Sequence, residues 1–574
     1  MVTKLHRIAK RFREEFTGAL GGSVFGAALL ALAVTGLPGC SDNNNDSNNS
    51  EPTVSLQILW TNDTHGYFFP TYHAEYEELD TYAGTAATEG KVGGYAQIKG
   101  LVDSLKAQKT DGNTLFVDGG DTFDGSPTAQ ITKGAAVIPI LNAMGYDAMV
   151  PGNRDFAFGK TDFLADTAAL TFPVVCANLV DGTTNQYVFP RYIVKQLPGL
   201  KVAIIGVTSP LAGGSSTGFK VLNGGVPGAF AIEDNISALA ARIRVEENPD
   251  LVIVLSHMGY FQDQKFASRS TNIDAIVGAH THHNIYDAPV VKNKDGSRNV
   301  VVVQAGSHGK FLGKLDLTVG MNSRKVIGFN NQLIRMNNQI TTTPDAAVQA
   351  LADAAYAPYQ AYFDTFVGYS TTVIARRGAT QSTMANLLAD AYAATQGTDL
   401  ARHAGIRYGS SIPGSVANPA TITVGDVWNM VSPNIGAGVY VYTQTGAQIK
   451  STIDSGLNTE FGTDPYTWGG GDVTRFNGGL KYTYRVNAPD GQHIVDMTIT
   501  SGGVDYALVT NGVSDATNLA RTYTVTATGT APAGGTQINP ANPNEAVDEI
   551  VAYIQAQPSQ TVGPVIDNRT QEVQ

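Results

Sequence analysis

The chain has 574 residues, of which 43% are hydrophobic and 15% charged, so it can bury large cores and is expected to form two or more domains. Its formal net charge is −12, and lysine and arginine cluster only in the first segment, which argues against a nucleic-acid backbone as partner. An acidic chain can still hold phosphate in a local site.

Residues 1–40 are typical of an export signal, with a basic start followed by a Gly/Ala/Leu run. The run ends in LPGC, which resembles the lipobox at which bacterial lipoproteins are cleaved and lipidated. We therefore expect an exported protein, in the periplasm or on the cell surface, anchored to a membrane through a lipid on Cys40. An ordinary cleaved signal is the alternative. Residues 41–53 are polar and predict a flexible tether.

Residues 54–335 alternate short apolar runs with amphipathic stretches. The runs are SLQILWTND, NTLFVDGGD, DAMVPGN, FPVVCANL, KVAIIGVT, DLVIVLSH, IDAIVGAHTHH and NVVVVQAGSHG. Short runs rich in Val, Ile and Leu that end in polar or Gly-containing loops indicate buried strands of a layered α/β fold. Such folds gather their functional sites at the C-terminal ends of the strands.

The sequence pattern changes after residue 335. An Ala-rich helical segment begins near Thr341, and residues 336–370 are predicted to bridge two domains. Beyond Val373 come an amphipathic helix, MANLLADAYAATQ, and the alternating runs GVYVYTQTG, GGLKYTYRV and RTYTVTATG. Residues 371–574 are therefore predicted to form a second, α+β domain.

Side chains that bind metals recur at the predicted strand ends. They are Asp63 and His65 in TNDTHG, Asp121 in DGGDT, Asn153 in PGNRD, His257 in LSHMG, and His280 and His282 in GAHTHH. Alternate residues of an extended segment project to the same side, so each closely spaced pair can converge on one cation. Mixed carboxylate and imidazole ligands suit zinc, manganese or iron better than calcium. The alternative is that these residues are only polar strand caps.

These motifs, together with GDTFDGSP, GVTSP and GKFLGKLDL, resemble the calcineurin-like metallophosphoesterases of the bacterial 5′-nucleotidase family from Leu56 onward. The resemblance implies a four-layer α/β metallophosphoesterase sandwich followed by a smaller α+β C-terminal domain. It also implies two divalent metal ions (Zn, Mn or Fe). Asp63, His65, Asp121 and His282 would bind one, and Asp121, Asn153, His257 and His280 the other. Two such ions lower the pKa of a bridging water and neutralise phosphoryl oxygens.

The segment after Asn153 departs from the family pattern. The family has a histidine next, and three residues later an aspartate that orients it, whereas this chain has Arg154 and Ala157. Arginine can donate to a phosphate but does not act as a general acid near neutral pH. Arg154 is therefore predicted as a catalytic phosphate or sulfate clamp; alternatively it pairs with Asp155 or another carboxylate. His283 or His308 could replace the missing histidine.

The second domain of the family supplies arginines that bind the substrate phosphate. HAGIRYG resembles its Gly-Gly-Ile-Arg motif and indicates Arg407, while ARRGATQ indicates Arg376 or Arg377. The motifs that stack the nucleotide base are altered, in SPNIGAG and TGTAPAGGTQ, which puts ordinary nucleotide recognition in doubt.

The sequence thus predicts an exported hydrolase of phosphate esters, nucleotide or nucleotide-like, that uses a metal-bridged hydroxide. The alternatives are a metal-retaining lipoprotein that binds a phosphate or sulfur oxyanion with little turnover, and a sulfur-ester hydrolase.

Overall fold

The first sheet forms because strongly apolar segments pair in the order β13-β12-β1-β2-β3. Its strands are β1 (Thr53–Thr61), β2 (Thr114–Asp118), β3 (Ala148–Met149), β12 (Phe311–Gly320) and β13 (Lys325–Arg335). The three N-terminal strands run parallel to one another, and β12 returns antiparallel beside β1. The C-terminal ends of β1, β2 and β3 therefore meet at one edge.

The second sheet has the order β10-β11-β9-β8-β6-β5. Its strands are β5 (Tyr192–Gln196), β6 (Lys201–Val207), β8 (Leu251–Ser256), β9 (Ala275–Val277), β10 (Val290–Lys292) and β11 (Asn299–Val303). Strands β6, β8, β9 and β11 are parallel, so their C-terminal ends also share an edge.

The two sheets pack face to face through one apolar core. Leu56, Ile58 and Trp60 alternate along β1 on the inner face, and they belong to the same buried cluster as Ile204 and Ile253 of the second sheet. The period of two in β1 matches the pleat of a strand, in which alternate side chains face the same side.

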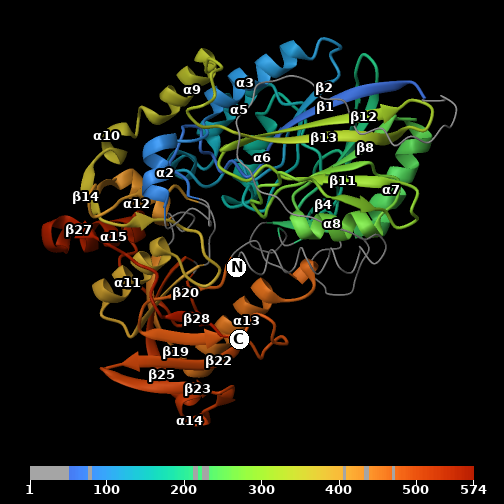
Figure 1. Ribbon diagram of the computed structural model, residues 1–574. Helices are drawn as coiled ribbons and strands as arrows, with labels where there is room; N and C mark the ends of the chain where they lie inside the picture. The colour runs from blue at the N-terminus through green and yellow to red at the C-terminus, as the bar shows by residue number, and fades with distance from the viewer. Residues whose placement is uncertain are drawn as a thin grey trace, which may run out of the picture. The chain divides into compact units, whose positions relative to one another are not determined.

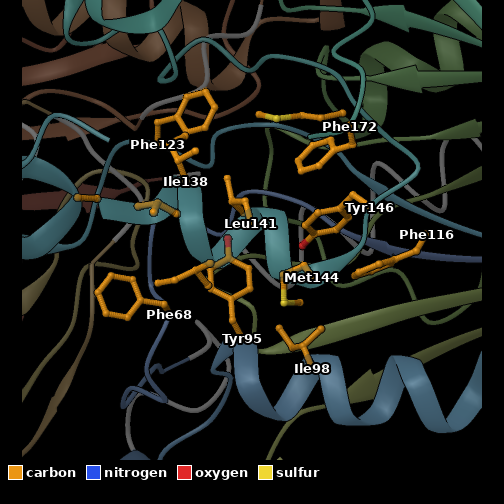
Figure 2. Packing of buried hydrophobic residues seen from close by; sticks show 14 of the residues in the cluster. Phe68, Tyr95, Ile98, Phe116, Phe123, Ile138, Leu141, Met144, Tyr146 and Phe172 are labelled. Carbon is orange, nitrogen blue, oxygen red and sulfur yellow. The ribbon is translucent and has the colours of Figure 1, made fainter. Parts of the chain in front are cut away.

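Helices cover the outer faces. The outer core of the first sheet joins Leu59 and Phe116 to helix residues such as Tyr95, Leu141 and Met144, and Figure 2 shows several of these side chains gathered together. The helices of this layer are α3 (Tyr95–Gln108), α4 (Pro127–Ile131), α5 (Ile138–Met144) and α6 (Gly159–Ala168), while α2 (Tyr82–Glu89) buries Tyr82 and Ala86 in a small separate cluster with Ala74 and Ala375.

On the second sheet, α7 (Ile232–Glu246) and α8 (Tyr260–Arg269) bury Ile236, Leu239 and Phe266 against β6 and β8. Figure 1 shows both helices in green beside these strands. The order helix, sheet, sheet, helix confirms the predicted four-layer sandwich.

One predicted strand is wrong. In FPVVCANL, residues 172–178 make only an isolated bridge, between Val174 and Met149, although Val175 and Cys176 are fully buried. The backbone N–H groups of Cys176 and Ala177 donate instead to the carbonyls of Pro190 and Gly206. A strand begins only at β4 (Leu179–Asp181), which pairs with β7 (Phe219–Val221).

The predicted bridge contains α9 (Ala346–Tyr356) and α10 (Gln360–Phe363), and its last residues belong to β14 (Phe366–Ser370). α9 buries Val348 and Ala352 in the helical core of the first sheet. The domain boundaries given above stay a prediction.

The C-terminal part mixes helices with sheets whose strands are mainly antiparallel, which fits the predicted α+β character. Its helices are α11 (Thr383–Gln396), α12 (Val424–Val431), α13 (Gly446–Phe461), α14 (Ala516–Ala520) and α15 (Glu545–Ala556). Its larger sheets have the orders β20-β16-β25-β19-β26 and β24-β23-β22-β21-β28. Their strands are β16 (Leu400–His403), β19 (Gly438–Thr445), β20 (Arg475–Phe476), β21 (Leu480–Tyr484), β22 (Ile494–Ser501), β23 (Val504–Thr510), β24 (Val513–Ser514), β25 (Thr522–Gly529), β26 (Thr536–Gln537) and β28 (Thr570–Glu572). Smaller sheets add β15 (Val373–Ile374), β17 (Ile412–Pro413), β18 (Ala420–Thr423) and β27 (Thr561–Val562).

This computed structural model describes residues 51–74, 81–210, 212, 218–222, 232–404, 409–431, 438–467, 472–529 and 531–573. The predicted signal with Cys40, most of the tether, Arg407, the altered SPNIGAG segment and part of TGTAPAGGTQ lie outside these ranges. Within them, no helix has the length and apolar character needed to cross a membrane.

Candidate metal centre

The predicted metal ligands lie in the loops that directly follow five strands. Asp63 and His65 follow β1, and Asp121 and Asn153 follow β2 and β3 of the same sheet. The others come from the second sheet, with His257 after β8 and both His280 and His282 after β9. The parallel strands thus deliver side chains from both sheets to one place.

The first group contains Asp63, His65 and His282, all buried, with potential ligand atoms within 4.8 Å of one another. His65 Nε2 lies 3.1 Å from His282 Nε2, and His282 Nε2 lies 3.3 Å from Asp63 Oδ1. The second group contains Asp121, His257 and His280 with the same proximity.

Asp121 lies between the two groups. Its Oδ2 atom is 3.3 Å from His257 Nε2 and 3.9 Å from His65 Nε2. Such a position suits a carboxylate shared by two cations, as the family resemblance implied. Asn153 completes the neighbourhood with an Oδ1 atom that is buried and takes no hydrogen bond. An amide oxygen of this kind is expensive to bury unless it has a partner, so it fits a metal ligand.

The backbone at these residues is unusual. Asp63, His65, Asp121, His280 and His282 have φ between 49° and 74°. Residues other than glycine seldom adopt this left-handed conformation, which costs free energy and clusters at functional sites. Five such residues in one site indicate that the folded chain holds the side chains in place against local preference.

Carbonyl groups orient two of the imidazoles. His65 Nδ1 lies 2.9 Å from the Asp124 carbonyl, and His257 Nδ1 lies 2.6 Å from the Gly119 carbonyl. A carbonyl only accepts, so Nδ1 carries the proton and Nε2 of the neutral ring is left to bind a cation.

Without a bound metal, the pKa values of the buried ligand side chains depend strongly on one another. Burial raises the pKa of Asp63 to about 7, although His257 opposes this shift. Burial alone would lower the pKa of His257, but Asp121 outweighs it and raises that pKa to about 10. Burial likewise opposes ionisation of Asp121, yet His257 holds its pKa well below the usual range. The buried anions therefore need nearby positive charge, which divalent cations would supply.

Arg154 is tied to two aspartates of the loop after β2. Its backbone N–H donates to Asp121 Oδ1 at 2.6 Å, and its Nε donates to Asp124 Oδ2 at 2.7 Å. Its Nη2 also pairs with Asp124, whose side chain is completely buried. The alternative that Arg154 pairs with a carboxylate is thus observed, with Asp124 as the partner. Whether Arg154 also contacts substrate stays a prediction.

Asp155 has a different task. Its two carboxylate oxygens accept from the backbone N–H groups of Gly152, Asp121, Thr122 and Phe123 at 2.7–3.0 Å. It therefore fixes the loop that carries Asp121. Neither this role nor that of Asp124 was predicted from the sequence, although Asp124 belongs to the motif GDTFDGSP and Asp155 to PGNRD.

His308 lies against the first ligand group. Its ring centroid is 5.7 Å from that of His65 and 5.9 Å from that of His282. His308 Nε2 accepts from the Gly409 backbone N–H at 3.1 Å, which joins the site to the C-terminal part of the chain.

The predicted substrate arginines differ in their surroundings. Arg376 is buried, and its Nη2 donates to the Asn429 carbonyl at 3.2 Å and to the Met430 carbonyl near the end of α12. Arg377 is half-buried, and its charge, after burial and Lys310, helps to lower the pKa of His73. Their roles in substrate binding stay predictions.

Comparisons with known proteins agree with this architecture. A family model described as calcineurin-like phosphoesterase matches residues 56–284, and one described as 5′-nucleotidase, C-terminal domain, matches residues 365–541. A 5′-nucleotidase of Vibrio vulnificus is 26% identical over 331 residues, which cover 53% of this chain and 56% of the relative. The chain spans about half the length of several such curated relatives.

Two solved structures from Thermus thermophilus share the fold. The sulfate thiohydrolase SoxB in complex with glycerol has a TM-score of 0.77 at 21% identity, covering 90% of this chain and 96% of the other. A 5′-nucleotidase precursor has a TM-score of 0.74 at 22% identity, covering 91% and 99%. With its calcineurin-like phosphoesterase domain and its 5′-nucleotidase C-terminal domain, the chain belongs to the 5′-nucleotidase-like phosphoesterases.

Proposed function

We propose that this protein is an exported, metal-dependent hydrolase of small phosphate esters, nucleotide or nucleotide-like. The observation that supports this most strongly is the pair of buried ligand groups with Asp121 between them. Two divalent cations bound there would supply a water nucleophile and positive charge for the phosphoryl oxygens. Zinc, manganese and iron all suit this donor set.

The chain's own residues then have separate tasks. Asp63, His65 and His282 hold one cation, and Asn153, His257 and His280 hold the other, with Asp121 shared. Arg154 contributes a fixed positive charge, and Arg376, Arg377 and Arg407 are proposed to bind the substrate phosphate.

The experiment is hydrolysis by the mature chain loaded with manganese or zinc. AMP, UDP-glucose, cyclic nucleotides, p-nitrophenyl phosphate esters and p-nitrophenyl sulfate serve as substrates, and Asp121→Asn should abolish turnover. Asp295→Asn is the matched control, because Asp295 is an exposed turn residue. Metal retention without turnover of any substrate would support the oxyanion-binding alternative, and turnover of sulfur esters alone would support the sulfur-ester hydrolase.

The proposed export and lipid anchor rest on residues 1–53 of the sequence. We propose that these residues are followed by a domain of residues 54–335, a bridge of residues 336–370 and a second domain of residues 371–574. Cys40→Ser should release the protein from the membrane fraction of a bacterial host. Equal membrane association of both forms would contradict the lipid anchor and leave the hydrolase proposal intact.

A further inference from the structure

The surroundings of Arg154 bear on how a leaving group can depart. Its backbone N–H holds Asp121 Oδ1, and its guanidinium pairs with the buried Asp124. Gln130 Nε2 donates to the other oxygen of Asp124, so the partner carboxylate is itself held in place. The Arg154 side chain is nevertheless 29% exposed. The guanidinium is thus fixed by Asp124 close enough for its charge to act on His65, while part of the Arg154 side chain reaches solvent.

A guanidinium stays protonated at all accessible pH values, so Arg154 offers charge and hydrogen bonds but no transferable proton. Protonation of the leaving oxygen would have to come from another group near the centre.

His308 is the imidazole next to the first ligand group that is not itself a proposed ligand. Its Nε2 accepts from the Gly409 N–H, which can only donate, so the proton of the neutral ring is on Nδ1. Nδ1 lies 2.8 Å from Ser307 Oγ, and the residue is 1% exposed. Its proton therefore faces a neighbouring hydroxyl within the protein.

Two further candidate acids also make hydrogen bonds within the protein. The Tyr67 hydroxyl, whose ring lies 4.7 Å from that of His308, donates to Asn429 Oδ1 at 2.7 Å. His283 Nδ1 lies 2.8 Å from Thr281 Oγ1, and its ring packs against Tyr260 and Phe261 of α8. Across the described ranges, each of these candidate acids has a hydrogen-bond partner within the protein.

From this arrangement we infer that the enzyme selects substrates by the acidity of their leaving group, an inference that rests on the proposed function. It hydrolyses phosphoanhydrides and aryl phosphates, whose leaving groups depart as stable anions, much faster than alkyl monoesters. In the reaction a water oxygen bonds to phosphorus while the bond from phosphorus to the leaving oxygen breaks. The leaving oxygen takes the electron pair of that bond and departs unprotonated, beside the positive charge of Arg154, and the water proton passes to solvent.

The test is a leaving-group series with the manganese-loaded full chain. We expect kcat/KM for aryl phosphates to fall steeply as the pKa of the departing phenol rises. ADP should yield one phosphate and accumulate AMP, because loss of general acid catalysis typically costs about 10²- to 10⁴-fold on the alkyl ester.

Arg154→His combined with Ala157→Asp restores an acid and its orienting carboxylate on one turn, since the Ala157 N–H donates to the Arg154 carbonyl. This variant should raise the rate on AMP relative to p-nitrophenyl phosphate by about 10²-fold or more, and show a shallower leaving-group dependence. Ala157→Asp alone is the matched control, because it adds the carboxylate at an exposed position while Arg154 stays, and it should keep the steep dependence.

The outcomes separate the two proposals. If the native protein hydrolyses AMP as fast as ADP and shows no leaving-group dependence among aryl phosphates, the inference is overturned while the hydrolase remains. If the metal-loaded protein turns over none of the aryl phosphates, ADP and AMP, the proposed function itself is overturned, whereas turnover of AMP alone overturns only the inference. The native measurements decide both points even if a variant fails to fold.

Discussion

Single buried side chains decide the geometry of the centre. Asp155 is 1% exposed and satisfies four backbone N–H groups around Asp121. Because a buried N–H without a partner is costly, this carboxylate supports both stability and the position of the proposed shared ligand.

We therefore expect Asp155→Asn to lower the free energy of unfolding by about 1–3 kcal/mol and to weaken metal binding, because an amide N–H₂ cannot accept from the loop. Urea unfolding and manganese titration of the same preparation measure the two effects. Asp295→Asn serves as control, since that exposed carboxylate accepts from one turn N–H. Unchanged metal affinity in Asp155→Asn would contradict a positioning role.

Asp263 gives a prediction of pH dependence. It is fully buried on α8, and Ser256 Oγ donates to its Oδ1 at 2.6 Å. Burial raises the pKa of Asp263 to about 8 from a model-compound value of 3.8. A folded pKa above the unfolded one means that the stabilisation is complete below about pH 4 and is lost as the pH rises toward 8.

Asp263→Asn stays uncharged, so its stability relative to the native protein should improve between pH 5 and pH 7.5, by up to about 1.4 kcal/mol per pH unit. Urea unfolding of metal-free protein at the two pH values gives this difference. A difference in stability that is the same at both values would show that Asp263 does not titrate in this window.

At the scale of elements, α11 holds the end of the chain. Arg569, just before β28, pairs with Asp390 of α11 at 3.0 Å and with Asp567 at 2.7 Å. Asn386 of the same helix donates to the Val565 carbonyl at 2.8 Å. These contacts join the last segment to a buried helix whose Leu388 and Tyr392 lie in the C-terminal core.

Removing these ion pairs with Arg569→Ala should lower the free energy of unfolding by about 1.5–3 kcal/mol, the usual range for hydrogen bonds to charged groups. Limited proteolysis should then cut the segment after β27 faster than in the native protein. Arg521→Ala is the control, since Arg521 is exposed and stacks on the Tyr506 ring at 3.8 Å. Equal cleavage of Arg569→Ala and native protein would show that β28 pairing alone holds the segment.

At the scale of the whole molecule, the proposed ligands come from both sheets and span Asp63 to His282 in the sequence. Cations that bind the folded arrangement and not the unfolded chain stabilise the entire sandwich. Binding at a concentration 100 times Kd adds about 2.7 kcal/mol to the free energy of unfolding.

We therefore expect a chelator to lower Tm, and added manganese or zinc to restore it. His280→Ala should reduce this metal-dependent shift, while Asp295→Asn should keep it. An identical Tm with chelator and with excess metal would contradict a structural contribution of the cations.

The sequence by itself determined the strands that end in the ligands, because buried parallel strands are apolar runs and the residues that follow them are polar. It also predicted the α+β texture of the C-terminal part from its alternating Thr, Val and Tyr. The same rule failed for FPVVCANL, since burial alone makes a segment apolar whether or not it pairs in a sheet.

Only the tertiary structure decided which partner Arg154 takes, what Asp155 holds and where His308 directs its proton. Asp124 lies 30 residues before Arg154, and Gly409 lies 101 residues after His308. Local sequence patterns carry the periodicity of an element and the polarity of its ends. A hydrogen bond between distant segments depends instead on how whole sheets and helices pack, so the character of the site's ligands was predictable while the arrangement that controls their chemistry was not.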